Sequence, residues 1–296
     1  MKYLEKYGYT PDAARIDADL KSIASRIAEN TTPEALKLCF SIMDLTTLSP
    51  SDTVESVGKL VEKVNRLPEM FPDYPAPASI CVYPNFGPTV RSLKKDPKVH
   101  VTNVASCFPS AQSFLEVKVR ECELAVENGA DEIDIVLALN AFLAGEEDRA
   151  FEEIVAMKKA IDKTAAAVGH EVVLKVILET GILASPEKIA EASLLAMEAG
   201  ADFIKTSTGK VEVNATPMAA YVMCEAIRRF HEVTGRRVGF KAAGGISNAQ
   251  DAIYYYSIVA KVLGQEWLNP KYFRFGVSRL GNNLVSAIEG KEIKYF

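Results

Sequence analysis

The feature that most limits the fold of this chain is a regular alternation of short apolar runs with segments of helical periodicity. Within residues 114–128, for example, Leu115, Val119, Cys122 and Val126 recur at spacings of three and four, as on the buried face of a helix. The apolar runs are five to eight residues long, and there are eight of them: Phe40–Thr46, Ser79–Tyr83, Val99–Ala105, Asp131–Ala138, Val172–Glu179, Phe203–Thr208, Val238–Gly244 and Phe273–Ser278. This order predicts parallel strands connected by helices.

Eight such units predict an α/β fold, a (β/α)8 TIM barrel, over residues 40–296. The size fits, because single barrels typically contain about 250 residues. The 39 residues before the first run form an N-terminal helical extension, in which residues 12–28 have helical spacing. We expect this extension to pack on the barrel or on a partner. A doubly wound open sheet is the competing fold, but no glycine-rich phosphate turn follows the first run, which disfavours it.

Charge and hydropathy exclude several classes of partner. The net charge of -5 and the isoelectric point near 5.5 give no basic surface for nucleic acid. The apolar runs are too short to span a bilayer, and the N-terminus lacks the apolar segment of a signal peptide. We therefore expect neither a nucleic-acid partner nor a membrane partner.

Cysteine and histidine usage bears on redox state and metal binding. The five cysteines are dispersed without a Cys-x-x-Cys pair, so reduced thiols and a cytoplasmic location are expected. The three histidines, His100, His170 and His231, lie in no common motif. We therefore expect no metal site and no cofactor.

Single charges interrupt four successive apolar runs. Lys205 and Lys241 are each the only cation in an apolar strand that leads to glycine. In a barrel such a side chain points into the lumen, because the other face of the strand meets the helix ring. Similar charges are Asp131, Glu132 and Asp134 on the fourth run and Lys175 and Glu179 on the fifth.

Two lysines on neighbouring strands indicate amine chemistry, with one nucleophile and one cation that depresses its pKa. The alternative is an ionic network that only holds the strands together, which would account for a single pair better than for three lysines. The last three strands also end in glycines: Gly209, Gly244, Gly245 and Gly276. Their backbone amides are suited to a phosphate group, although glycines here can also simply turn the chain.

At these residues the sequence closely resembles the deoxyribose-phosphate aldolases, from about residue 36 to about residue 290. The segments that carry the resemblance are Met43–Leu48, Gly129–Asp134, Leu174–Gly181, Gly200–Lys210 and Gly239–Gly245. The resemblance implies a TIM barrel and reversible cleavage of 2-deoxy-D-ribose 5-phosphate into D-glyceraldehyde 3-phosphate and acetaldehyde. It further implies a lysine Schiff base and no metal.

The resemblance also implies roles for individual residues. Lys205 matches the Schiff-base lysine, Lys241 the second lysine that perturbs it, and Asp134 the acid of the proton relay. Asp44 and Thr46 are expected at substrate hydroxyls, and Lys175 is expected to tune the charge of Asp134. The expected contacts to phosphate and substrate at the ends of the last strands are Thr208, Gly209, Lys210, Gly244, Gly245, Gly276, Ser278 and Arg279.

The chain departs from the family at several positions. Ala242 stands where the family often has proline, and residues 137–140 lack the family's aromatic segment. Arg279 replaces a small hydroxyl residue at the start of the last helix. A cation there opposes the helix dipole, so Arg279 either holds the substrate phosphate or is an ordinary solvated arginine.

The sequence thus predicts a cytoplasmic class I aldolase, a carbon-carbon lyase of deoxyribonucleotide catabolism, acting on small phosphorylated sugars and aldehydes. Two alternatives stay open: a transaldolase-like enzyme that requires a ketose donor, and a non-catalytic sugar-phosphate binder. The oligomeric state is also open, with a homodimer or a homotetramer as candidates.

Overall fold

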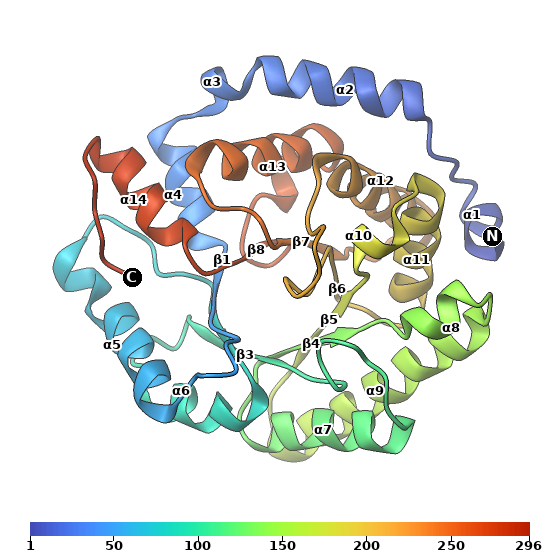
Figure 1. The fold of residues 1–296 in the computed structure, drawn as a ribbon, viewed down its shortest axis with the longest axis horizontal. Coiled ribbons are helices and arrows are strands. Elements are labelled where there is room, and N and C mark those ends of the chain that lie inside the picture. Colours follow the sequence, from blue (N-terminus) through green and yellow to red (C-terminus); the bar gives the residue numbers. More distant parts are fainter.

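The computed structural model describes residues 1–296 and shows a closed barrel of eight parallel strands, each paired with its neighbours in sequence order (Figure 1). Closure between β1 and β8 excludes the open sheet and confirms the (β/α)8 prediction. Each predicted run contains one strand. The strands are β1 (Met43–Thr46), β2 (Ser79–Val82), β3 (His100–Val104), β4 (Glu132–Val136), β5 (Val173–Ile177), β6 (Phe203–Lys205), β7 (Gly239–Ala243) and β8 (Phe273–Val277).

Helices surround the barrel and connect its strands (Figure 1). Two of them, α11 and α12, begin at a proline that follows a side-chain cap, a favoured helix start. The helices after β1 are α5 (Val54–Met70), α6 (Gly87–Leu93), α7 (Leu115–Glu127), α8 (Leu139–Leu143), α9 (Glu147–Val168), α10 (Thr180–Leu183), α11 (Pro186–Glu198), α12 (Pro217–Thr234), α13 (Ala249–Val262) and α14 (Leu280–Glu289), with short 3-10 turns η1 (Pro84–Phe86) and η2 (Gln265–Trp267).

Four helices precede β1: α1 (Lys2–Tyr7), α2 (Ala13–Ser25), α3 (Ile27–Asn30) and α4 (Pro33–Ser41). Helix α1 is fixed at its start, because the carboxylate of Glu191 on α11 accepts hydrogen bonds from the first backbone amides of α1. Helix α2 runs across the outside of α12 and α13 (Figure 1) and buries Ile16 and Ile23. The extension therefore packs on the helices of its own barrel.

The first strand begins later than its apolar run. Thr32 caps α4 by accepting a hydrogen bond from the amide of Ala35, and Pro33 occupies the first turn. The helix then continues to Ser41 and buries Phe40 completely. The prediction of a strand from Phe40 was wrong by one helical turn, because a buried helix end and a buried strand are equally apolar.

The barrel has two interiors, an apolar layer between the strands and the helices and a charged lumen inside the strands. The main apolar cluster fills the space between the strands and the helix ring. The lumen contains a chain of charged side chains, because the strand register places Asp134 beside Lys175 and Lys205 beside Lys241. No helix in the chain is both long and apolar enough to cross a membrane.

Candidate active site

A cavity of about 490 Å³ opens at the carboxyl ends of the strands. This is the end at which barrel enzymes carry their active sites. Nine of the residues expected from sequence line this cavity: Thr46, Lys205, Thr208, Gly209, Lys210, Gly244, Gly245, Gly276 and Ser278. The sequence therefore predicted the place of the cavity from glycines and one lysine on separate strands.

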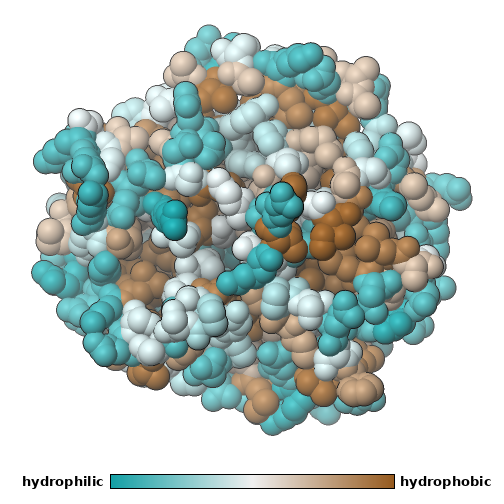
Figure 2. All heavy atoms as spheres, viewed as in Figure 1, coloured by the Kyte–Doolittle hydropathy of each residue, from teal (hydrophilic) through white to brown (hydrophobic).

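The face around the barrel mouth is mixed in polarity. Figure 2 shows hydrophilic residues over much of it and a group of hydrophobic residues to the right of its centre, on the side where Figure 1 places α8 and α10. Leu143 on α8 and Ile182 on α10 are each 46% exposed. Apolar surface therefore lies on one side of the face that carries the cavity.

Lys205 and Lys241 meet on one carboxylate inside the barrel. The Nζ atoms of Lys205 and Lys241 each lie 2.8 Å from Oδ2 of Asp134. All three side chains are buried, and only Lys205 lines the carboxyl-end cavity. The three residues for which the sequence predicted catalytic roles therefore contact one another.

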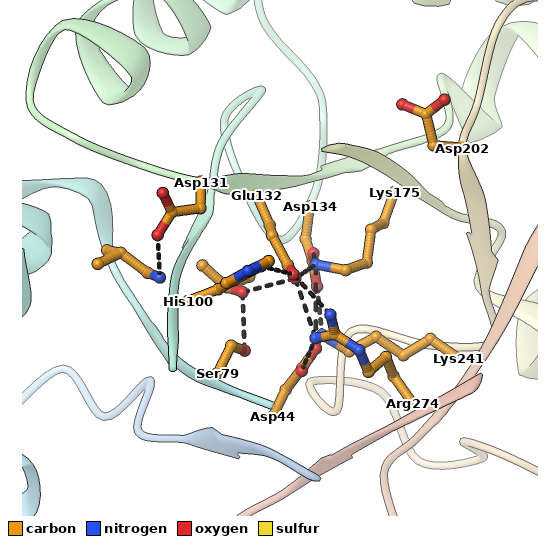
Figure 3. A network of polar contacts seen from close by, with 12 residues as sticks. Asp44, Ser79, His100, Asp131, Glu132, Asp134, Lys175, Asp202, Lys241 and Arg274 are labelled. Carbon is orange, nitrogen blue, oxygen red and sulfur yellow. Dashed lines mark hydrogen bonds and ion pairs between the residues drawn. The ribbon is translucent and has the colours of Figure 1, made fainter. Parts of the chain in front are cut away.

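A second set of charges lies in the lumen toward the amino ends of the strands, and Figure 3 shows their contacts. Lys175 contacts Asp134 at 2.8 Å and Glu132 at 2.5 Å. Arg274 contacts Asp44 at 2.6 Å and Glu132 at 2.7 Å. The second carboxylate partner of Lys241 is Asp44. Asp44 thus pairs with three cations inside the lumen and does not line the cavity, contrary to its expected place at a substrate hydroxyl.

The lumen holds three carboxylates and four basic side chains. The carboxylates are Asp44, Glu132 and Asp134, and the basic side chains are Lys175, Lys205, Lys241 and Arg274. Lys175, Lys241 and Arg274 each contact at least two carboxylates, whereas Lys205 contacts only Asp134. Charges balance in this buried space when Lys205 is the one base without a proton.

Burial and neighbouring charges move the pKa values of the two central lysines in opposite directions. Burial lowers the pKa of Lys205, and repulsion by Lys241 lowers it further against the opposing attraction of Asp134. Burial also disfavours the charged form of Lys241, but Asp134 and Asp44 together outweigh it and raise the pKa of Lys241. Lys205 is therefore the amine closer to its neutral, nucleophilic form.

The carboxylates remain ionised. Burial alone would raise their pKa values, but Lys175, Lys205 and Lys241 hold the pKa of Asp134 well below its usual range. Against the same cost of burial, Arg274 and Lys175 hold the pKa of Glu132 well below its usual range. The four basic groups and three acids thus form one mutually dependent ionic cluster.

Two glycines make room for this arrangement. A Cβ atom on Gly276 would lie 3.1 Å from Cε of Lys241 and 2.9 Å from Cβ of Ala243, so a side chain there would displace the lysine. Gly244 has a φ of +83°, and a Cβ atom on it would lie 2.6 Å from Cβ of Asn214. Glycine at these positions is therefore required by close packing and by a left-handed backbone.

Hydrogen bonds fix the loop at the rim of the cavity. The hydroxyl of Thr208 donates to Glu179 at 2.5 Å, and the amide of Thr208 donates to the other oxygen at 3.1 Å. Lys210 Nζ donates to the carbonyl of Leu48 across the mouth at 2.5 Å. Glu179 therefore orders the loop after β6. The prediction that it points into the lumen with the lysines was wrong.

Asp131 lies elsewhere than expected, and Arg279, for which two alternatives were open, lies at the surface. Asp131 accepts hydrogen bonds from the amide of Val101 and from Arg91, apart from the lumen cluster (Figure 3). Strand β4 begins at Glu132, so its neighbour Asp131 points to the opposite side. Arg279 is exposed and does not line the cavity.

The sequence interpretation missed Arg274 and His100. Arg274 is a single cation between Phe273 and Phe275, which is the same signal that identified Lys205 and Lys241. His100 Nδ1 lies 2.7 Å from Oε1 of Glu132. This pair depends on the register between β3 and β4, so no local motif predicts it.

Nowhere in the chain do three or more His, Cys, Asp or Glu side chains form a group that could hold a metal ion. The lumen carboxylates are already paired with cations. Their oxygens form ion pairs with lysine and arginine nitrogens.

Comparison with known proteins shows that the chain is similar to aldolases over most of its length. The model of the DeoC/LacD family aldolases matches residues 39–258. A Caenorhabditis elegans protein named "Putative deoxyribose-phosphate aldolase" is 42% identical over 258 residues, which cover 86% of this chain and 82% of that protein.

Solved structures show the same fold. The tetrameric deoxyribose phosphate aldolase from Aeropyrum pernix is 24% identical, with a TM-score of 0.66 over 95% of this chain and 98% of that one. An aldolase named QR15 is 28% identical, with a TM-score of 0.63 over 85% of this chain and 95% of that one.

Proposed function

Because this chain belongs to the DeoC/LacD family of aldolases, we propose that it reversibly cleaves 2-deoxy-D-ribose 5-phosphate into D-glyceraldehyde 3-phosphate and acetaldehyde. The reaction proceeds through a Schiff base on Lys205. The observation that carries this proposal is that Lys205 alone among the buried cations lines the carboxyl-end cavity and has only one carboxylate partner. Such an amine combines access to substrate with a lowered pKa.

The chemistry begins with the neutral amine of Lys205 attacking the C1 aldehyde of the open-chain sugar. The resulting carbinolamine loses water to give a protonated imine. A base then removes the proton from the C3 hydroxyl, the C2–C3 bond breaks, and its electron pair moves into the imine to form an enamine. D-glyceraldehyde 3-phosphate leaves, the enamine carbon takes up a proton, and hydrolysis releases acetaldehyde and the free amine.

Asp134 is the proposed proton shuttle, acting through water at the C3 hydroxyl and at the enamine carbon. Its carboxylate contacts the nucleophile and also Lys175 and Lys241. Since the pKa of Asp134 lies well below its usual range, a proton that it accepts passes on rather than staying. Lys241, which contacts the same carboxylate oxygen as Lys205, is positioned to exchange that proton.

The far end of the cavity is the proposed phosphate site. Its lining includes Gly244, Gly245, Gly276 and Ser278, together with Lys210 from the opposite loop. Backbone amides of glycine-rich turns and one cation form a suitable environment for a phosphate dianion. Substrate then spans the cavity from Lys205 to these loops.

The test is turnover of 2-deoxy-D-ribose 5-phosphate in the presence of EDTA, together with trapping of the intermediate. Acetaldehyde and borohydride should leave a stable ethyl adduct, and peptide mapping should place it on Lys205. Turnover should persist with the chelator, because no step above uses a metal. An adduct on Lys175 or Lys241, or activity that depends on added zinc or magnesium, would overturn the proposal.

A further inference from the structure

The residue after Lys205 joins β6 to β7 in an unusual way. Lys205 is paired with Lys241, and the amide of Thr206 then donates a hydrogen bond to the carbonyl of Lys241 at 3.0 Å. Hydrogen bonds in a parallel ladder are evenly spaced, so the next one would run from the amide of Ala243 to the carbonyl of Thr206. That carbonyl instead accepts the amide of Thr180, from the segment after β5, at 2.9 Å. The regular ladder between β6 and β7 therefore stops at Thr206.

The hydroxyl of Thr206 takes the place of its own carbonyl. Its Oγ1 accepts a hydrogen bond from the amide of Ala243 at 3.0 Å and donates one to the carbonyl of Ala243 at 3.2 Å. Both residues are buried, and a buried backbone group without a partner costs about as much free energy as a lost hydrogen bond. One hydroxyl therefore pairs with both backbone polar groups of Ala243.

The two residues that this hydroxyl joins stand beside the two ends of the proposed substrate site. Thr206 directly follows Lys205, and Ala243 directly precedes Gly244 and Gly245. Lys205, Ala243 and both glycines line the carboxyl-end cavity, whereas Thr206 does not. The contact therefore links the strand end that carries the nucleophile to the strand end that leads into the glycine turn.

We infer that Thr206 is a positioning residue: its hydroxyl fixes the distance between the amine of Lys205 and the glycine turn, and so makes the enzyme select a five-carbon aldehyde with a terminal phosphate. This inference rests on the proposed function, in which substrate spans the cavity from Lys205 to that turn. It assigns specificity for the phosphorylated sugar to a side chain that does not itself contact substrate.

The glycine turn depends on such a fixed point. Gly244 and Gly245 have φ angles of +83° and +81°, and glycine has more backbone freedom than any other residue. A Cβ atom on Gly245 would meet nothing within 4 Å, so packing does not hold this part of the turn. Ala243 is also paired with Gly276 of β8, which lines the same cavity. A shift of Ala243 would therefore move both glycine segments of the proposed phosphate site.

The consequence differs between phosphorylated and unphosphorylated sugars. A phosphorylated sugar contacts the amine of Lys205 and the glycine turn at the same time, so a displaced turn either loosens the phosphate or moves the aldehyde away from the amine. An unphosphorylated sugar makes no contact through a phosphate and does not depend on the position of the turn. The ratio of kcat/KM for the phosphorylated sugar to kcat/KM for the unphosphorylated sugar, here called the phosphate ratio, therefore reports the spacing.

The experiment measures the phosphate ratio with 2-deoxy-D-ribose 5-phosphate and 2-deoxy-D-ribose in the wild type and four variants. Thr206→Val keeps the shape of the side chain without the hydroxyl, Thr206→Ser keeps the hydroxyl, and Thr206→Cys carries a thiol that is a weak donor and a weak acceptor. Thr234→Val is the matched control. The hydroxyl of Thr234 also accepts one backbone amide and donates to one carbonyl, but it lies at the end of α12 and does not line the cavity.

We expect Thr206→Val to lower the phosphate ratio by about tenfold or more, with little change in kcat/KM for 2-deoxy-D-ribose. Thr206→Ser and Thr234→Val should keep the wild-type ratio, and Thr206→Cys should lie between Thr206→Ser and Thr206→Val. The rate at which acetaldehyde and cyanoborohydride label Lys205 should be the same in all five proteins, because this reaction uses the amine and not the turn. A hydroxyl that only stabilised the barrel would not separate the two sugars.

An equal loss of activity on both sugars in Thr206→Val, or no loss on either, would overturn the inference while leaving the proposed function intact. If Thr206→Val does not fold, Thr206→Cys decides, and a wild-type phosphate ratio in that variant would overturn the inference. Absence of any Lys205 adduct in the wild type would overturn the proposed function and this inference with it.

Discussion

The two ends of the barrel lumen contain the same kinds of side chain in two different states of pairing. At the amino end, Arg274 contacts two carboxylates and Lys175 contacts three. At the carboxyl end, Lys205 has one carboxylate, shared with other cations, and it faces a cavity. The cations at the amino end have enough carboxylate partners. At the carboxyl end there is one lysine more than the carboxylates can neutralise.

The difference shows how a barrel can hold a lysine in its reactive form. Burial alone would lower the pKa of every lumen lysine, yet the carboxylates raise the pKa of both Lys175 and Lys241. Only the lysine with the fewest carboxylate contacts retains the effect of burial. The well-paired cations therefore lie at the amino end, and the lysine with the lowered pKa lies at the carboxyl end.

Removing the unsatisfied lysine should separate reactivity from stability most clearly. Lys205→Leu should lower kcat/KM by a factor on the order of 10⁴ or more, as for other covalent nucleophiles. Its free energy of unfolding should stay equal or rise, because burial lowers the pKa of Lys205 and folding must therefore remove its proton at a cost that leucine does not carry. Thermal and urea denaturation alongside assays would check both values, and a large loss of stability would contradict the proposed imbalance.

Removing a satisfied cation should have the reverse result. Arg274→Met leaves Asp44 and Glu132 with an uncompensated buried charge, so the free energy of unfolding should fall by about 3–5 kcal/mol. Arg279→Met is the matched control at an exposed arginine, with an expected change within about 0.5 kcal/mol. A similar small change for both variants would mean that the amino-end cluster does not stabilise the barrel.

Lys241 links the two ends and should set the pH at which Lys205 becomes reactive. Lys241→Leu removes a repelling charge and leaves Asp134 to attract Lys205, so the pKa of Lys205 should rise by about one unit or more. The rising limb of the rate profile reports loss of a proton from Lys205, so this limb should move to higher pH as the rate falls. An unshifted limb would give Lys241 a different role.

The smallest expected effect lies at the rim. If Arg279 binds the substrate phosphate, Arg279→Ser should raise KM for 2-deoxy-D-ribose 5-phosphate by up to about tenfold with little change in kcat, because phosphate is held equally in ground and transition states. Unphosphorylated 2-deoxyribose should be turned over as before. An identical effect on both sugars, or on neither, would leave Arg279 as an ordinary surface charge.

Much of the fold and of the central cluster was predictable from local sequence. Eight apolar runs specified eight strands, and a lone cation in an apolar run identified Lys205 and Lys241. The same rule applied to Arg274 would have found it, since Phe273 and Phe275 flank it. These residues could be predicted from the sequence because the alternation of side chains along one strand decides which of them enter the lumen.

Other features depend on relations between strands. Asp131 was misplaced because adjacent residues of a strand point to opposite faces, so Asp131 cannot enter the lumen together with Glu132 and Asp134. The contact of His100 with Glu132 and the number of carboxylates around each lysine depend on register and side-chain length. The sequence therefore predicted that the three lumen lysines meet Asp134, but it predicted neither the place of Arg274 nor which lysine has the fewest carboxylate partners.

The most direct test of this account is an NMR titration of the lysine Nζ groups in the free protein, with each lumen lysine assigned by single substitution. The account predicts one lumen lysine that titrates below the usual range of lysine, its signal absent in Lys205→Leu, while Lys175 and Lys241 stay protonated throughout. A Lys205 that titrates within the usual range, or a Lys241 that titrates below Lys205, would contradict the claim that the surplus charge of the lumen is relieved at Lys205.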